Sequence, residues 1–207
     1  MLHKEIFSSS QQALFPLIKN FCPKFFLCGG TAIALHIGHR ESIDFDLFTT
    51  DDLNINILRK KLSEVDKDFS VLVKNEDEYT VVVRGVKVTF LCYPFPFDKF
   101  LLFEDIARVP DLLTLAAMKA YALGRRSKWK DYIDLYFILS RSHTLVEIIK
   151  RAEMMFGNEF NEKVFRAALA YFEDIDYSEA VSFRPGFQID DEYIRSELKR
   201  LSVEDGL

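Results

Sequence analysis

The sequence has little cysteine and no long hydrophobic run. Its three cysteines, Cys22, Cys28 and Cys92, are an odd number without regular spacing, which excludes a disulfide scaffold and favours reduced thiols in the cytosol. No apolar stretch approaches the roughly 18 residues of a membrane span. The first residues also lack the apolar run of a signal peptide. We therefore expect a cytoplasmic protein without a membrane partner.

The chain also lacks a positive charge balance. Its formal net charge is -5 over 207 residues, so it has no global attraction to nucleic acid, and any RNA contact needs a local basic patch. What it does have is apolar content: 49% of the residues are hydrophobic and 20 are phenylalanine. This is enough for a large, aromatic-rich core.

The first hundred residues alternate between strand patterns and short helices. In the segment 43–48, Ile43, Phe45 and Leu47 alternate with Asp44 and Asp46, which is the period of a strand with one buried face. Strands are expected at 25–28, 43–48, 69–73, 79–83 and 86–91, with a tight turn at 84–85, and helices at 11–19, 32–36 and 53–62, the last capped by Asp51 or Asp52. The fold class predicted from this half is α/β, a mixed sheet flanked by helices.

From residue 111 onward the apolar residues recur at helical spacing. Helices are expected at 112–123, 132–139, 146–156, 160–172 and 190–201. The change of period near residue 100 predicts an α/β domain over 1–100 and a helical domain over 101–207, joined around 97–110. We expect the helical domain to close a cleft over the sheet.

One short motif combines a glycine turn with two acids. Gly29 and Gly30 follow a strand, Thr31 opens a helix, and Asp44 and Asp46 lie on one face of the next strand. Carboxylates two strand residues apart, roughly 7 Å, can share Mg²⁺ ions that clamp the phosphates of a nucleotide. The glycines allow close approach of the backbone, and the free N–H groups of the helix start can bind phosphate. The pattern favours metal-assisted phosphoryl transfer, although each feature alone also fits a plain turn or an amphipathic strand.

A second group of charged residues lies in the helical half. On a helix from Asp111, Lys119 and Arg126 are seven residues apart and are expected to share a face two turns apart. Basic residues are dense over 125–130. Such a cluster could neutralise a triphosphate, or it could be an ordinary solvated surface. Asp131 and Asp134 follow one helical turn apart. They are candidates to orient Lys119, to lie near the metal, or to act as a base, and Asp131 alternatively caps a helix.

Three residues between the glycines and the acids need separate consideration. Arg40 lies close enough to the glycine turn to contact phosphate, or it pairs with Glu41 or an aspartate. His36 and His39 do not predict a zinc site, because Gly38 interrupts the helix between them and no further ligand stands out.

These residues resemble those of a known family. The runs Gly29-Gly30-Thr31, His39-Arg40 and Asp44-x-Asp46 look like motif I of the nucleotidyltransferase superfamily, and more closely like that of the AbiEii/AbiGii toxin family, which includes the MenT toxins. The runs from Met118 to Arg126 and from Lys128 to Leu135 resemble the helical segment of that family. The resemblance spans roughly residues 25–140, with two motifs in the expected order.

The resemblance implies a Mg²⁺-dependent nucleotidyltransferase, a toxin of a toxin–antitoxin or phage-defence system. Its implied site comprises Asp44, Asp46, Lys119 and Asp131 as catalytic residues, with Asp44 and Asp46 on the metal and with nucleotide contacts from Gly29, Gly30, Thr31, Arg40, Lys119 and Arg126. The implied partners are an NTP, an acceptor RNA such as a tRNA 3′ end, and an antitoxin.

The sequence departs from the superfamily at one position. Many relatives carry a third carboxylate on a later strand, where this chain has Thr89. Either the base comes from elsewhere, with Asp131 and Asp134 as candidates, or no base is needed, or activity is reduced. Two alternatives therefore stand beside the enzyme: a nucleotide-binding relative with impaired catalysis, and an enzyme that transfers a nucleotidyl or phosphate group to protein.

Overall fold

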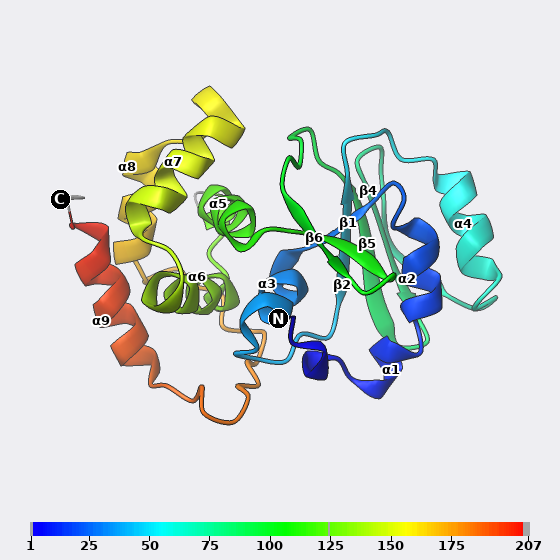
Figure 1. Ribbon diagram of the computed structural model, residues 1–207, viewed down its shortest axis with the longest axis horizontal. Helices are drawn as coiled ribbons and strands as arrows, with labels where there is room; N and C mark the ends of the chain where they lie inside the picture. Colours follow the sequence, from blue (N-terminus) through cyan, green and yellow to red (C-terminus); the bar gives the residue numbers. More distant parts are fainter. Residues whose placement is uncertain (1, 124, 205–207) are drawn as a thin grey trace.

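The computed structural model describes residues 2–123 and 125–204 (Figure 1). In these residues seven strands form one mixed sheet with the order β3-β4-β5-β2-β1-β7-β6. The strands are β1 (Phe26–Cys28), β2 (Phe45–Thr49), β3 (Ser70–Lys74), β4 (Glu78–Val83), β5 (Val86–Cys92), β6 (Phe100–Phe103) and β7 (Ala107–Pro110). The α/β class with a mixed sheet, expected from the sequence, is confirmed.

The centre of the sheet places β2 between β1 and β5. β2 runs antiparallel to β1, with Cys28 opposite Asp46, and parallel to β5, with Asp46 opposite Thr89. β4 and β5 form the expected hairpin, and the two residues of its turn, Arg84 and Gly85, both have positive φ. This conformation is that of a turn suited to the twist of paired strands. The register fixes which side chains face the same side as Asp46.

Helices cover both faces of the sheet. In Figure 1, α2 (Phe15–Phe21) and α4 (Ile55–Ser63) lie on one side, and α3 (Gly29–Ile37) lies on the other, between the sheet and α5 (Leu112–Leu123) and α6 (Trp129–Arg141). The short helices η1 (Lys4–Ile6) and α1 (Ser9–Gln12) precede α2. α3 thus connects the sheet to the helical half of the chain.

Two helices of the helical half begin at capping residues that the sequence contains. The helical half continues with α7 (Leu145–Phe156), η2 (Gly157–Glu159), α8 (Glu162–Ala170) and α9 (Asp191–Ser202). Thr144 and Glu147 form a capping box at α7, and the Asp190 carboxylate accepts two backbone N–H groups at α9, which satisfies donors that a helix start leaves free. α5 is buried over most of its surface, as expected for a helix that packs between the sheet and other helices.

Several boundaries differ from those expected. The segment 97–110, expected to be a linker, contains β6 and β7, and β7 pairs in parallel with β1, so the sheet extends to Pro110. The predicted helix 11–19 is divided into α1 and α2. α4 is capped by Asn54 in place of Asp51 or Asp52, because the Asn54 side chain accepts the N–H of Ile57. The boundary between domains at residue 100 stays a prediction.

The connection between α8 and α9 returns to the sheet side of the molecule. The orange segment in Figure 1 passes beneath α6 toward α3. Its backbone pairs with the α3–β2 connection, where Glu41 N–H donates to Ser182 at 2.9 Å and Arg184 N–H donates to His39 at 3.0 Å. No sequence pattern predicted this contact, which brings residues near 180 to the motif around residue 40.

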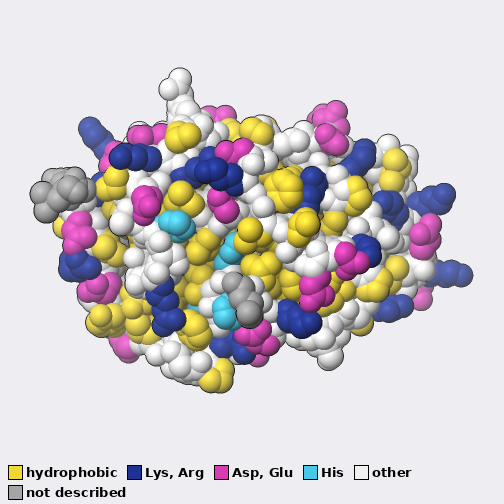
Figure 2. Space-filling view, viewed as in Figure 1, with side chains coloured by type: hydrophobic (Ala, Val, Ile, Leu, Met, Phe, Trp, Pro, Cys, Tyr) yellow, Lys and Arg dark blue, Asp and Glu magenta, His cyan; other side chains and the backbone are white. Residues whose placement is uncertain are grey.

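The surface shows no field of a single charge sign on the face drawn in Figure 2, where cationic and acidic side chains are interspersed around hydrophobic ones. Among the described residues, no helix is long and apolar enough to cross a membrane.

Candidate active site

The glycine turn meets the acidic strand directly. Gly29 has φ +65°, and a Cβ placed on it would lie 2.8 Å from Cγ of Asp46 and closer still to one carboxylate oxygen. Only glycine tolerates both this backbone conformation and this contact. The contact arises because β1 ends at Cys28, opposite Asp46, so the first residue of α3 passes across the carboxylate. The sequence predicted this convergence of turn and acids.

Asp44 and Asp46 lie on the same face, with different surroundings. Asp44 forms an ion pair of 2.7 Å with Lys87 of β5. Burial raises the pKa of Asp46, and the nearby charge of Asp44 raises it further. A divalent cation bound between the two carboxylates would favour the charged form of Asp46. The pair therefore fits a metal ion.

The Thr31 hydroxyl contacts the acidic segment of the chain. Its hydroxyl donates to the backbone carbonyl oxygen of Asp44 at 2.6 Å and lies 2.7 Å from Ser42 Oγ. The side chain is buried, and α3 already begins at Gly29. The structure favours a positioning role for Thr31, which fixes the backbone of Asp44, over the predicted phosphate contact and helix cap.

Asp134 of α6 is the centre of a buried ionic cluster. Its side chain is 0% exposed, and it accepts from His39 Nε2 at 2.9 Å and from Arg40 Nε and Nη2 at 2.8 and 3.0 Å. Lys119 Nζ lies 3.1 Å away. Burial by itself raises the pKa of Asp134, but the charges of Arg40 and Lys119 and these hydrogen bonds outweigh it, so the pKa falls well below its ordinary value. Asp134 thus joins the helical half to the α3–β2 connection as a fixed anion.

This cluster changes the role of Arg40 and Gly30. Both Nε and Nη2 of Arg40 are directed to Asp134, and the residue is 2% exposed. A Cβ on Gly30 would contact the guanidinium and come within 3.5 Å of Asp134. Of the two interpretations of Arg40 from sequence, the ion pair is the one the geometry favours. Gly30 is needed for the space that this ion pair occupies.

Asp131, one turn earlier, orients the cations that face the cleft. Its carboxylate forms ion pairs with Lys119 Nζ and with Arg126 Nε, the latter at 2.9 Å. Burial raises the pKa of Asp131, but Lys119 and Arg126 lower it by more, and the net pKa is lowered. A carboxylate whose pKa is lowered has little affinity for a proton, so it is a weak general base. The structure therefore favours a positioning role for Asp131, and Asp134 has the same limitation.

These groups surround one cleft of about 120 Å³. Its charged lining, within the part of the chain that the structure describes, consists of six cations, Arg40, Lys87, Lys119, Arg126, Lys128 and Lys130, and four acids, Asp44, Asp46, Asp131 and Glu179. A surplus of cations beside a carboxylate pair is suited to a polyphosphate with a divalent ion. The cleft thus brings together four residues that were predicted for the site, Asp44, Asp46, Lys119 and Arg126.

Two charged members of the cleft, Lys87 and Glu179, were missed from the sequence. Lys87 lies on the same strand face as Thr89, so the alternation of β5 could have identified it. Glu179 lies in the returning segment and binds Lys128 and Lys130. Its hydrogen bond with Lys128 and its contact with Lys130 outweigh partial burial and lower its pKa to about 2. No local pattern indicated Glu179, because its position depends on the path of a long connection.

The position of the absent third carboxylate is also clear. Thr89 lies directly opposite Asp46, and its hydroxyl is 3.3 Å from that of Thr80 on β4. In the described residues, no group of three or more His, Cys, Asp or Glu side chains is arranged to hold a metal. Of the four acids in the cleft, Asp131 and Glu179 each form ion pairs with two cations. Asp44 and Asp46 are the adjacent pair, and Mg²⁺ commonly takes one or two carboxylates together with phosphate oxygens.

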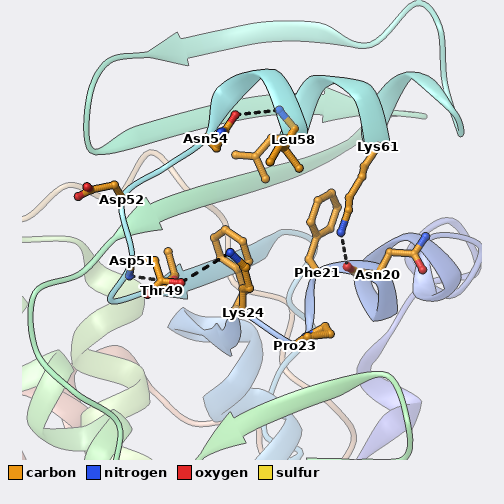
Figure 3. A pocket seen from close by; sticks show the side chains of 12 residues that line it. Asn20, Phe21, Pro23, Lys24, Thr49, Asp51, Asp52, Asn54, Leu58 and Lys61 are labelled. Carbon is orange, nitrogen blue, oxygen red and sulfur yellow. Dashed lines mark hydrogen bonds and ion pairs between the residues drawn. The ribbon is translucent and has the colours of Figure 1, made fainter.

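Another pocket, of about 190 Å³, lies against the opposite face of the sheet (Figure 3). It opens between α2 and α4, and Thr49, two strand steps beyond Leu47, points into it. Lys61 donates to the backbone of Asn20 there at 2.7 Å. It contains neither the carboxylate pair nor the glycine turn, so we place the chemistry in the first cleft.

The comparisons with known proteins agree with this geometry. The profile described as nucleotidyl transferase AbiEii toxin, type IV TA system, matches residues 12–94. The uncharacterized protein aq_aa25 of Aquifex aeolicus is 30% identical over 192 residues, which cover 86% of this chain and 88% of that protein.

Solved structures share the fold over nearly the whole chain. JHP933 from Helicobacter pylori has a TM-score of 0.61 at 16% identity and covers 98% of this chain and 92% of its own. MenT4, a nucleotidyltransferase toxin from Mycobacterium tuberculosis, has a TM-score of 0.61 at 14% identity. The match covers 94% of this chain and 80% of the MenT4 chain. The chain therefore carries, over residues 12–94, the nucleotidyl transferase domain of the AbiEii toxin family of type IV toxin–antitoxin systems.

Proposed function

We propose that this protein transfers a nucleotide from an NTP to a hydroxyl group of an acceptor and releases pyrophosphate. The acceptor oxygen forms a bond to the α-phosphorus, the bond from that phosphorus to the β-phosphate oxygen breaks, and the proton of the hydroxyl leaves to solvent. The observation that carries the proposal is the convergence of Asp46, the Gly29 turn and Lys119 of the helical half around one cleft.

Asp44 and Asp46 would hold Mg²⁺, which supplies charge stabilisation for the phosphate oxygens when bound. The raised pKa of Asp46 supports this assignment, because a cation is what makes both carboxylates favourable at once. For Asp44 to bind the metal, Lys87 either releases the Asp44 carboxylate or stays beside it and contacts a phosphate.

The cations supply the electrostatic part of catalysis. Lys119 is 6% exposed and is held by Asp131 and Asp134, so its ammonium group keeps one position at the edge of the cleft. Arg126 is more exposed and shares Asp131. A preorganised charge stabilises the transition state without a cost of reorganisation. We assign the triphosphate to Lys119 and Arg126, with Asp131 as their positioning residue.

The acceptor implied by the family resemblance is an RNA, in particular a tRNA 3′ end. Lys128 and Lys130 line the same cleft and provide a local basic surface in an acidic chain, which is the feature that RNA contact requires. An antitoxin is the partner that the family implies. We propose a cytoplasmic location, because NTPs and tRNA are there.

The proposal is tested by incubating the protein with each α-³²P-labelled NTP, Mg²⁺ and total RNA. We expect label in RNA from at least one NTP, and its loss on addition of EDTA or in the Asp44→Ala/Asp46→Ala variant. Label on protein would favour the protein-modifying alternative. NTP binding without any transfer would favour the impaired relative and contradict the proposed reaction.

Replacing Gly29 with alanine tests the contact between the turn and the acid. We expect a loss of about 1–3 kcal/mol in the free energy of unfolding from the strained φ, and a loss of about 100-fold in transfer, because the methyl group displaces Asp46. Urea titration and the transfer assay measure the two effects.

The matched control is Gly157→Ala. Gly157 also has positive φ, but no described heavy atom lies within 4 Å of a Cβ built there. The Gly157→Ala variant should lose a similar amount of the free energy of unfolding and keep the transfer activity of wild type. Equal transfer by both variants would contradict the role of the turn.

A further inference from the structure

A second cavity adjoins the cleft and differs from it in chemistry. It has a volume of about 310 Å³, and its apolar and aromatic lining contrasts with the charged lining of the cleft. We call it the side pocket. It is lined by Gly29, Ile33, Phe48, Leu91, Tyr93, Leu115, Met118, Lys119, Tyr121, Ala122, Arg125 and Arg126.

The side pocket is continuous with the cleft through two cations. Lys119 and Arg126 line both cavities, Gly29 lines the side pocket, and Gly30 lines the cleft. A ligand whose phosphates lie against these cations can therefore extend its remaining part into the side pocket. Apart from Lys119, Arg125 and Arg126, the lining of the side pocket carries no charge, so its apolar remainder suits an uncharged part of the ligand better than phosphate.

The aromatic side chains of the side pocket are held in place by their neighbours. Tyr93 packs against Phe48, with 5.3 Å between ring centroids. On the opposite wall, Arg125 lies over the Tyr121 ring at 3.6 Å, and its guanidinium donates to the backbone of Glu159 at 3.2 Å. Burial raises the pKa of Tyr93, so its hydroxyl is neutral and can donate or accept. These are flat surfaces with few polar groups, the surroundings in which bases stack.

We propose that the side pocket holds the base of the donor NTP, between Tyr93 on the sheet side and the α5 wall. This inference rests on the proposed function and adds the position of the base to it. The prolines around Tyr93, at positions 94 and 96, fix the backbone of this loop.

The test compares NTPs with inorganic tripolyphosphate, which has the phosphates but no base. Dissociation constants are measured by calorimetry with Mg²⁺ and without RNA, so that an acceptor cannot occupy the pocket. We expect at least one of ATP, CTP, GTP and UTP to bind at least about tenfold more tightly than tripolyphosphate.

Ala122→Trp fills the side pocket from a half-buried position of α5. We expect it to abolish this tenfold preference and to change tripolyphosphate binding less than twofold. Tyr93→Leu, which removes the ring and keeps an apolar side chain, should reduce the preference at least about fivefold, the lower end of a base-stacking contribution. The control is Ala167→Trp, at an exposed position of α8, which should change neither constant.

The outcomes separate the two proposals. If tripolyphosphate and NTPs bind wild type equally, or if both variants leave the preference unchanged, the side pocket is not the base site and the proposed function stands. If neither compound binds, the proposed function fails together with the base site. Circular dichroism establishes that each variant is folded, and a result from either folded variant decides the question.

Discussion

Asp46→Asn is expected to lower nucleotidyl transfer by about 10³-fold and, in buffer without metal, to raise the melting temperature. Activity falls because the variant loses one of two carboxylate ligands, and metal stabilisation of the reacting phosphate is worth several kcal/mol, at about 1.4 kcal/mol for each factor of ten. Stability rises because the charged form of Asp46 is unfavourable in the fold, through burial and through the charge of Asp44.

Transfer assays and thermal melts with and without Mg²⁺ measure both effects. Mg²⁺ should stabilise wild type, because it binds the folded state, and should have much less effect on the variant. Asp52→Asn, an exposed acid on the far side of the sheet, serves as the control and should change neither property. A destabilised Asp46→Asn, or equal Mg²⁺ responses of variant and wild type, would exclude Asp46 as a metal ligand whose charge is unfavourable in the fold.

Asp134→Asn is expected to cost about 3–5 kcal/mol of the free energy of unfolding, the usual cost of removing one partner from a buried ion pair. The variant keeps the shape of the side chain but leaves the charges of Arg40 and Lys119 without their common anion. Transfer should fall as well, because Lys119 loses one of the two carboxylates that fix it. Urea unfolding gives the free energy, and the transfer assay at a temperature where the variant is folded gives the second effect.

A surface ion pair provides the comparison for Asp134. Glu197→Gln breaks the exposed pair with Arg200 and should cost at most about 1 kcal/mol. The double variant Arg40→Met/Asp134→Asn should cost less than the sum of the two single variants, because the second change removes a charge that the first left unpaired. Additive costs would show that Arg40 and Asp134 do not act as one unit.

The dependence of stability on pH follows from the same carboxylates. Asp131 and Asp134 have lowered pKa values, so the stability they contribute is present above the ordinary aspartate value of 3.8 and is lost as pH falls through their folded pKa values. Asp46 has the opposite sign, and the gain from Asp46→Asn should disappear as pH falls below 3.8. Unfolding titrations between pH 7 and pH 2 measure both trends.

The local elements could be predicted because local spacing determines them. The alternation of Phe45, Asp46 and Leu47 fixes a strand and its two faces, and the positive φ of the Arg84–Gly85 turn follows from its residue types. The strands β6 and β7 were missed, because Pro110 and the exposed apolar residues of β6 give no clean alternation, and their place depends on the free edge of β1.

The sequence by itself determined the carboxylate pair, the glycine turn and the helix that carries Lys119, since each depends on neighbours a few residues away. Only the tertiary structure decided which partners these groups contact. His39 and Asp134 are 95 positions apart in the chain and are hydrogen-bonded in the fold. Arg40, which the sequence offered as a phosphate contact or an ion-pair partner, is paired with the same buried acid. Buried charge is stable only when it is paired. Which residues pair depends on how distant segments pack, so the assignment of Thr31, Arg40, Asp131 and Glu179 required the folded molecule.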